Sequence, residues 1–136
     1  MDRLLLTGAG GWIGSHCIDP LLARSYEIHG LCRGAAGPDP RVCWHSCDLL
    51  SGVDRRRVIE KIHPSHLLHL AWDVQPGYRT AAGNWDWLTA SVDLFAHFVQ
   101  AGGRRIVGAG TCLEYDWSSD VCSSDLYVCV HIAPKP

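Results

Sequence analysis

Short apolar runs and longer amphipathic stretches alternate along this chain, at the lengths of β-strands and α-helices. The apolar or alternating runs predict strands at 3–6, 26–32, 41–47, 67–71 and 105–109. Apolar residues at helical spacing predict helices over 12–24, 51–62 and 85–101. Strands that alternate with helices in this way predict an α/β fold, with a doubly wound parallel sheet, right-handed crossovers and strand order 3-2-1-4-5.

The turn between the first strand and the first helix is rich in glycine, with Thr7-Gly8-Ala9-Gly10-Gly11-Trp12-Ile13-Gly14. Gly8 would permit a tight turn, Gly11 would keep a side chain out of a phosphate's path, and Gly14 would let the helix pack close to the strand. The free N–H groups of the helix would then face an anion. The segment predicts a dinucleotide site in a Rossmann-type fold, and an ordinary strand-to-helix turn is the alternative.

In such sheets ligands bind at the carboxyl ends of the strands, where the strand order reverses. Five strand ends are expected to meet in one crevice there. After the glycine turn, the residues at these ends are Cys32 and Arg33, Asp48, the segment from Leu70 to Trp72, and Thr111.

Length and charge limit the classes of function. A chain of 136 residues, 47% hydrophobic, is expected to form one domain, and a net charge of −2 offers no basic surface for nucleic acid. Arg55-Arg56-Arg57 fits a solvated start of a helix. No basic leader precedes the first strand, and no apolar run approaches the roughly 20 residues that span a bilayer, so we expect a cytoplasmic protein without membrane contact.

Cysteine and histidine raise the question of a metal site. Seven scattered cysteines predict reduced thiols rather than disulfides. Cys43, His45 and Cys47 would share one face of a strand, but no second CxxC or HxxxH pair completes a set of four ligands. His69 lies in an apolar run, where a hydrogen-bonded core histidine is the simpler interpretation. The sequence therefore predicts no metal site.

Four motifs in order resemble the extended short-chain dehydrogenase/reductase family, the NAD(P)-dependent sugar-nucleotide epimerases, dehydratases and reductases. They are Thr7-Gly8-x-x-Gly11-x-x-Gly14, Asp48-Leu49, His69-Leu70-Ala71 and Gly110-Thr111-x-x-Glu114-Tyr115. The resemblance assigns Gly8, Gly11, Trp12, Ile13 and Gly14 to the pyrophosphate, and Asp48 and Leu49 to the adenine. It assigns Ala71 and Trp72, with Leu70 beside them, to the central region of the cofactor, and Thr111 to the active-site Ser/Thr position.

The end of the second strand bears on the choice of cofactor. A carboxylate there would accept hydrogen bonds from a ribose 2′-OH and repel a 2′-phosphate, but this chain has Cys32 followed by Arg33. A guanidinium holds a phosphate through charge-assisted hydrogen bonds. We therefore expect NADP, with NAD as the second candidate and a solvated loop arginine as the alternative interpretation of Arg33.

The resemblance implies hydride transfer on a small-molecule substrate, a nucleotide sugar, with Thr111 orienting the reacting oxygen. The family's general acid/base pair, Tyr-x-x-x-Lys, does not occur in this chain. Cys112 and Leu113 stand where dehydratases of the family carry acidic residues, which favours an epimerase or reductase. The alternatives are a non-catalytic NADP-binding fragment or sensor module and, third, a flavin- or mononucleotide-binding protein.

The character of the sequence changes at Ser118. The polar repeat over 118–126 resembles the translation of a sequencing-library adapter, which predicts an incomplete Rossmann domain over 1–117 and a non-native or disordered tail over 118–136. A polar linker into a further domain is the alternative. A sheet truncated after about five strands is expected to leave strand 5 as an unpaired edge and to favour association, including a homo-oligomer.

Overall fold

The computed structural model describes residues 1–34, 37–110 and 127–131. Its sheet has the order β3-β2-β1-β4-β5-β6, and the first five strands run parallel. This confirms the predicted order 3-2-1-4-5. The strands are β1 (Arg3–Thr7), β2 (Glu27–Cys32), β3 (Cys43–Ser46), β4 (His66–His69), β5 (Arg105–Ala109) and β6 (Tyr127–His131), and the helices are α1 (Trp12–Leu22), α2 (Gly52–Ile62), α3 (Asn84–Gln100) and the 3-10 turn η1 (Tyr78–Thr80).

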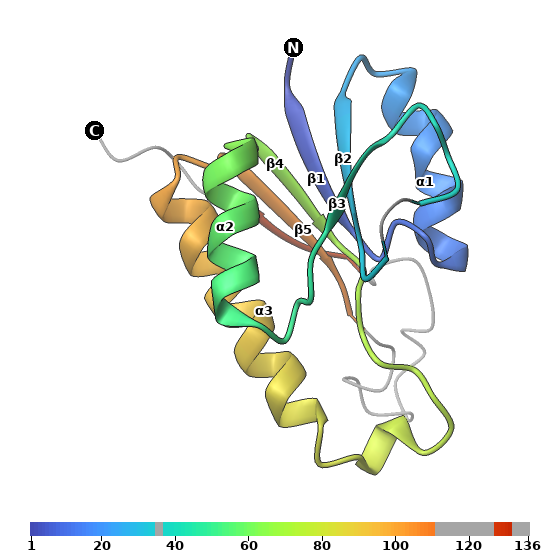
Figure 1. The fold of residues 1–136 in the computed structure, drawn as a ribbon, viewed down its shortest axis with the longest axis vertical. Coiled ribbons are helices and arrows are strands. Elements are labelled where there is room, and N and C mark those ends of the chain that lie inside the picture. Colours follow the sequence, from blue (N-terminus) through green and yellow to red (C-terminus); the bar gives the residue numbers. More distant parts are fainter. Residues whose placement is uncertain (35–36, 111–126, 132–136) are drawn as a thin grey trace, which may run out of the picture.

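Two helical layers enclose the sheet, with α1 on one face and α2 and α3 on the other (Figure 1). The central strand β1 is buried on both faces, and its middle residues, Leu4 to Leu6, are all apolar and divide between two cores. Leu4 and Leu6 pack in the α1 layer with Ile18 and Ile28. Leu5 packs in the α2 and α3 layer, whose core reaches Phe98.

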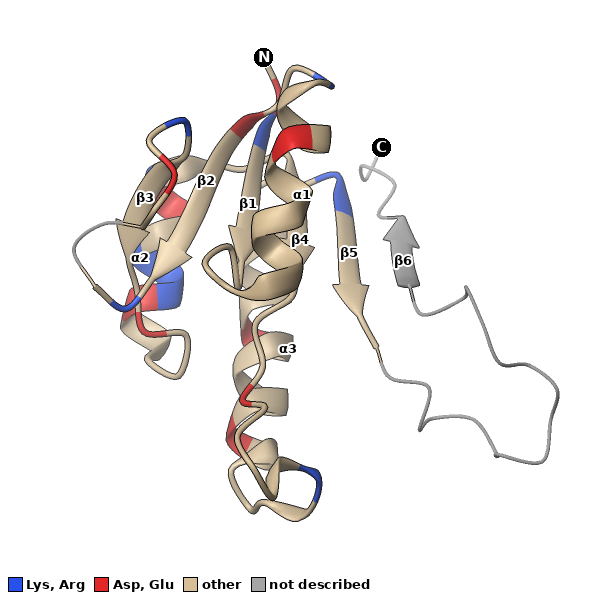
Figure 2. Ribbon diagram, turned by 90° about the vertical axis from the view of Figure 1, so that its right-hand side faces the viewer, with Lys and Arg blue, Asp and Glu red and all other residues tan. Residues whose placement is uncertain are grey.

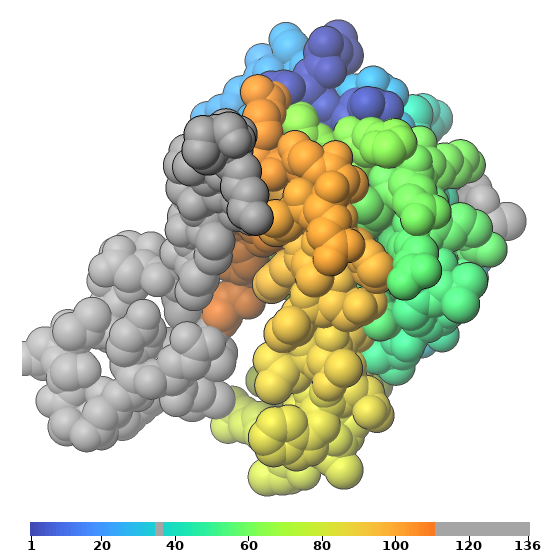
Figure 3. Space-filling model, turned by 90° about the vertical axis from the view of Figure 1, so that its left-hand side faces the viewer, coloured from blue at the N-terminus to red at the C-terminus, as the bar shows by residue number. Residues whose placement is uncertain are grey.

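Helices α2 and α3 lie side by side on the outer face of the second layer (Figure 3). Arg55 is buried between them, where its Nε donates to Asp93 Oδ2 over 2.7 Å and its NH1 donates to the carbonyl of Leu49. The prediction of a solvated arginine cluster is therefore wrong for Arg55, because α3 supplies a carboxylate that the local sequence does not reveal. Arg56 and Arg57 are exposed, as expected.

The element ends depart from the predictions by a few residues. Ser51 caps α2 as predicted, since its Oγ accepts from the N–H of Asp54 over 3.3 Å. The third strand starts later than predicted, because Asp39 holds the N–H of Arg41 through its Oδ1 and the N–H of Val42 through its carbonyl. These bonds make a turn where the alternating pattern predicted a strand.

The sixth strand corrects the prediction of an exposed edge. β6 pairs antiparallel with β5, from Ala109 opposite Tyr127 to Arg105 opposite His131, so β5 is not an unpaired edge. β6 lies within 118–136, and the assignment of that range to a non-native or disordered tail stays a prediction. Acidic and basic residues are spread over the described elements and gather on no one side in Figure 2.

Candidate functional site

The glycine turn leads directly from β1 into α1. Gly8 has φ +70°, a left-handed conformation that costs glycine little, and its carbonyl accepts the N–H of Gly11 over 3.0 Å. The carbonyl of Gly11 then accepts the N–H of Ser15 over 2.9 Å, as the first bond of the helix. The chain thus reverses from strand to helix within four residues, which brings the start of α1 to the carboxyl end of β1.

Close backbone packing explains two of the glycines. A Cβ built on Gly14 would lie 2.1 Å from the carbonyl oxygen of Gly8, so no side chain fits there without moving the backbone. A Cβ on Gly8 would lie 3.0 Å from the N of Ala71, on the segment that follows β4. Gly10, by contrast, faces open space. The packing tasks predicted for Gly8 and Gly14 therefore match the geometry of the turn.

The start of α1 has the features of an anion site. Gly11 is the N-cap residue, no side chain caps the helix, and the first turn contains no acidic residue. Trp12 and Ile13 are 80% and 54% exposed, so the first N–H groups of the helix lie at the surface. Unpaired N–H groups and the helix dipole both favour negative charge at this position. The charge at the start of α1 therefore suits an anionic group such as a diphosphate.

Thr7, the last residue of β1, ties the turn to the end of β4. Its Oγ1 accepts the N–H groups of both Leu70 and Ala71 over 3.1 Å and lies 2.8 Å from Nδ1 of His69. Leu70 and Ala71 belong to the loop and not to the strand as predicted, because their N–H groups bond to this side chain.

His69 continues this network into the helical layer. Its Nε2 lies 2.9 Å from Ser91 Oγ, which donates to the carbonyl of Trp87 over 2.8 Å. Since Ser91 donates its proton to Trp87, His69 donates from Nε2 to Ser91, and Thr7 donates to His69 Nδ1. Each side-chain hydrogen in this chain of bonds therefore has one acceptor.

Burial lowers the pKa of His69 to about 4, so the imidazole is neutral at neutral pH, as the network requires. The prediction of a hydrogen-bonded core histidine is confirmed. Sequence analysis missed Thr7 and Ser91 as its partners. The signal was a polar residue at the buried end of β1 and another on the inward face of α3.

The ends of β2 and β3 carry the residues predicted for the adenosine side. Arg33 is exposed and forms no ion pair within the ranges that the structure describes. The thiol of Cys32 donates to the carbonyl of Gly34 over 3.2 Å. Asp48 is exposed, and its Oδ1 accepts the N–H of Leu50 over 3.0 Å, while Leu49 is buried. The guanidinium and the Asp48 carboxylate are both accessible to a ligand.

The segment after β4 presents Trp72 at the surface, 39% exposed, with its Nε1 donating to Asn84 Oδ1 over 3.2 Å. That bond joins the loop to the first residue of α3. Thr111, the predicted active-site residue, lies outside the described residues. The structure thus brings the glycine turn and the 70–72 segment into contact, and it places Cys32, Arg33 and Asp48 at the carboxyl ends of the neighbouring strands.

The arrangement agrees with a comparison against known families. The chain matches the model of the NAD dependent epimerase/dehydratase family over residues 4–128. The chain belongs to this family. Its match starts in β1 and includes every predicted site residue.

Solved structures similar to this family member include three sugar-nucleotide epimerases. UDP-glucose 4-epimerase of Thermotoga maritima, crystallised with UDP-glucose, aligns with TM-score 0.68 and 20% identity over 80% of this chain and 38% of its own. The Thermus thermophilus UDP-glucose 4-epimerase complex with NAD gives TM-score 0.64 and 26% identity over 76% and 36%. The UDP-Glc/GlcNAc 4-epimerase of Campylobacter jejuni gives TM-score 0.76 and 17% identity over 93% and 42%. This chain therefore spans less than half the length of each enzyme.

Two further features of this epimerase/dehydratase family member concern surfaces away from the turn. A hollow between α2 and α3 is lined by Arg55, Arg56, Asp93 and His97, on the helical layer and not at the carboxyl edge of the sheet. None of the helices in the described part of the chain has the length and apolar character needed to cross a membrane.

Proposed function

We propose that this chain binds a nicotinamide dinucleotide at the carboxyl edge of its sheet, with the pyrophosphate on the N–H groups that open α1. The observation that carries the proposal is the uncapped, glycine-lined start of α1, where a Cβ at Gly14 would meet the backbone at 2.1 Å. Membership of an NAD dependent family and a similar solved epimerase that holds NAD support it.

The proposed roles follow the order of the strand ends. Gly8, Gly11 and Gly14 shape the cradle, and the N–H groups of Trp12 and Ile13 face the pyrophosphate. Asp48 and Leu49 lie on the adenine side, and Leu70, Ala71 and Trp72 line the central region. The bound dinucleotide supplies a hydride acceptor or donor at its nicotinamide ring. Thr111 would hold the reacting oxygen of the substrate through a hydrogen bond.

A pair of alanine substitutions tests the cradle. Gly11→Ala adds a methyl group that meets the carbonyl oxygen of Gly8 at 3.2 Å and projects from the N-cap, whereas Gly10→Ala adds one in open space. Losing hydrogen bonds to a charged phosphate costs about 1.5–3 kcal/mol, which corresponds to roughly 10- to 100-fold in affinity. We expect that loss for Gly11→Ala only, measured by NADPH fluorescence, with thermal melting to confirm that both variants fold. Equal affinities for the two folded variants would contradict the proposed cradle.

We further propose a preference for NADP over NAD, based on Arg33. The guanidinium is exposed, stands just after β2 and has no carboxylate beside it at Cys32. Arg33→Ala is expected to lower the affinity for NADPH by roughly 10-fold and to change the affinity for NADH little, because only NADPH carries the 2′-phosphate. Arg24→Ala, at the far end of α1, is the matched control. Similar losses for the two nucleotides would identify Arg33 as a solvated loop residue.

For the whole protein of which such a sheet is a part, we propose hydride transfer on a nucleotide sugar, as an epimerase or reductase. For the 136-residue polypeptide by itself, the second candidate is a binding module without turnover, since Tyr-x-x-x-Lys does not occur in it. An NADPH fluorescence shift without oxidation by a ketosugar nucleotide would favour the module, and measurable oxidation would favour the enzyme. The third candidate is a flavin- or mononucleotide-binding protein. A flavoprotein would be yellow when purified, and a mononucleotide-binding protein would not shift the fluorescence of NADPH.

A further inference from the structure

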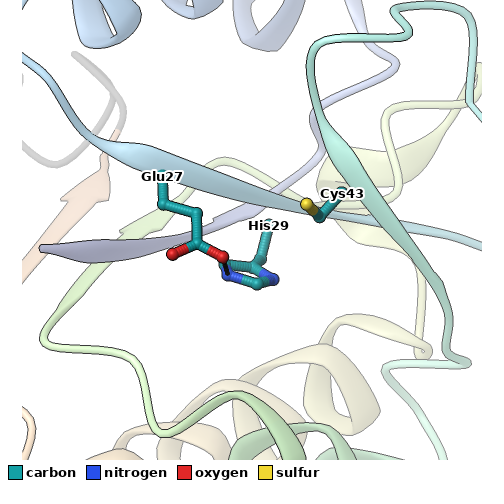
Figure 4. A group of neighbouring side chains, drawn as sticks. All are labelled: Glu27, His29 and Cys43. Carbon is teal, nitrogen blue, oxygen red and sulfur yellow. Dashed lines mark ion pairs between the residues drawn. The ribbon is translucent and has the colours of Figure 1, made fainter. Parts of the chain in front are cut away.

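Three side chains with metal-ligand chemistry converge at the amino-terminal end of β2 and β3. Glu27 and His29 are two apart on β2 and so share a face, and Cys43 on β3 is the register partner of His29. Their candidate ligand atoms all lie within 4.8 Å of one another. Figure 4 shows the Glu27 carboxylate and the His29 ring in contact, with the Cys43 sulfur coming from the neighbouring strand.

The two ring nitrogens of His29 face different neighbours, His45 and Glu27. Its Nδ1 lies 3.0 Å from Nε2 of His45, a hydrogen-bond distance. Its Nε2 is buried and makes no hydrogen bond within the described part of the chain, although it lies 3.1 Å from Glu27 Oε1. The His29 side chain is only 10% exposed, so solvent does not satisfy this nitrogen. This buried nitrogen therefore has one neighbour of opposite polarity, the Glu27 carboxylate, and a cation between the two atoms would bind both.

The distance between the His29 and Glu27 ligand atoms fits a tetrahedral ion. Two ligands about 2.0 Å from Zn²⁺ stand roughly 3.3 Å apart in tetrahedral geometry, close to the 3.1 Å between His29 Nε2 and Glu27 Oε1. We propose that Glu27, His29 and Cys43 form a metal site, with His45 orienting the His29 ring through Nδ1. A carboxylate, an imidazole and a thiolate together favour Zn²⁺, with water in the fourth position.

Charge around the cluster is consistent with a bound cation. The Glu27 carboxylate lies 3.1 Å from the His29 ring, and Arg3 and Lys61 add positive charge near that ring. Arg3 and Lys61 repel a cation, and the carboxylate with the thiolate offers two negative charges against them. Glu27 is 43% exposed and Cys43 is exposed, which gives an ion access from solvent.

The site would join β3, the edge strand, to β2, at the end of the sheet opposite the glycine turn. Sequence analysis predicted no metal site because it sought ligands along one strand, through Cys43, His45 and Cys47. The register between β2 and β3 brings in Glu27 and His29 from a segment 14 or more residues earlier in the chain. The proposal is independent of dinucleotide binding.

Cobalt(II) titration of the reduced, chelator-treated 136-residue chain tests the site. We expect saturation at one equivalent, with a thiolate-to-cobalt charge-transfer band, visible bands of four-coordinate geometry, and displacement by Zn²⁺. Cys43→Ser is expected to lose the thiolate band and to lower the affinity for Zn²⁺ by at least about 100-fold. This exceeds the roughly 10- to 100-fold loss that follows when only a ligand's hydrogen-bond partner is removed. Cys17→Ser, at a free cysteine on α1, should match the wild type.

Variants of the other residues complete the test. Glu27→Gln should keep the thiolate band and lower the affinity for Zn²⁺. Glu27 is partly exposed, and circular dichroism checks that the variant folds. His45→Phe should lower the affinity for Zn²⁺ by roughly 10- to 100-fold, because the ring of His29 loses the hydrogen bond that orients it. A thiolate band that survives Cys43→Ser, unchanged Zn²⁺ affinity in Glu27→Gln, or no saturable band in the wild type would each overturn the site.

Discussion

Acid is expected to destabilise this protein through His69. The imidazole is 8% exposed, and its pKa falls from 6.5 in a free side chain to about 4 in the fold because burial disfavours the charged form. The unfolded chain therefore binds a proton below pH 6.5 that the folded chain refuses until about pH 4. Stability then falls as the pH falls through this window, and the loss is complete below the lower pKa.

The size of the effect follows from the shift. One pKa unit corresponds to about 1.36 kcal/mol, so the two and a half units between the values amount to about 3 kcal/mol of unfolding free energy. That is a large part of the ~5–15 kcal/mol that stabilises a typical domain. Burial disfavours the charged ring, and the neutral ring is held by the hydrogen bonds to Thr7 and Ser91.

The assay is urea unfolding followed by tryptophan fluorescence at several pH values, for the wild type, for His69→Gln and for His16→Gln. Gln stays neutral at every pH, so the His69 variant should lose about 3 kcal/mol less stability between pH 6.5 and about 4 than the wild type and the exposed-histidine control. Subtracting the variant's stability curve from that of the wild type removes the contribution of the other histidines, which the two proteins share. Stability curves of the wild type and His69→Gln that run parallel through this window would refute the reasoning.

Two further substitutions test contacts whose contribution to stability does not depend on a titrating histidine. Gly14→Ala should destabilise the fold by about 1–3 kcal/mol or more in urea unfolding, because the new Cβ would lie 2.1 Å from the Gly8 oxygen, whereas Gly10→Ala should be close to neutral. Arg55→Ala should cost about 2 kcal/mol, since it removes the charged bond to Asp93 and the bond to the Leu49 carbonyl. The exposed neighbour Arg56→Ala should stay within about 0.5 kcal/mol, and equal effects at the two arginines would contradict the buried ion pair.

The strand order and the position of the candidate site followed from the sequence because both depend on local patterns. The apolar run of β1 is short, the glycine turn comes at once, and the residues after each strand share one edge in any parallel sheet. Boundaries were less accurate where a side chain competes for backbone groups. Asp39 shortens β3 and Thr7 takes the N–H groups after β4, and neither bond leaves a periodic signal.

Contacts between distant segments account for what the sequence did not predict. Arg55 looked solvated until α3 brought Asp93 to it, 38 residues later. Ser91 and Thr7 meet at His69 only because β1 pairs with β4 and α3 packs beneath them. The grouping of Glu27 and His29 with Cys43 needs the register of β2 against β3. In each case a polar side chain was visible in the sequence, and its partner was not.

The proposed dinucleotide site uses backbone atoms more than side chains. Its binding groups are the N–H groups at the start of α1, the missing Cβ atoms at Gly8 and Gly14 allow the close packing that places them, and the Thr7 hydroxyl joins the turn to the segment after β4. Substitutions that add an atom at these glycines are therefore expected to matter more than the loss of any exposed side chain nearby.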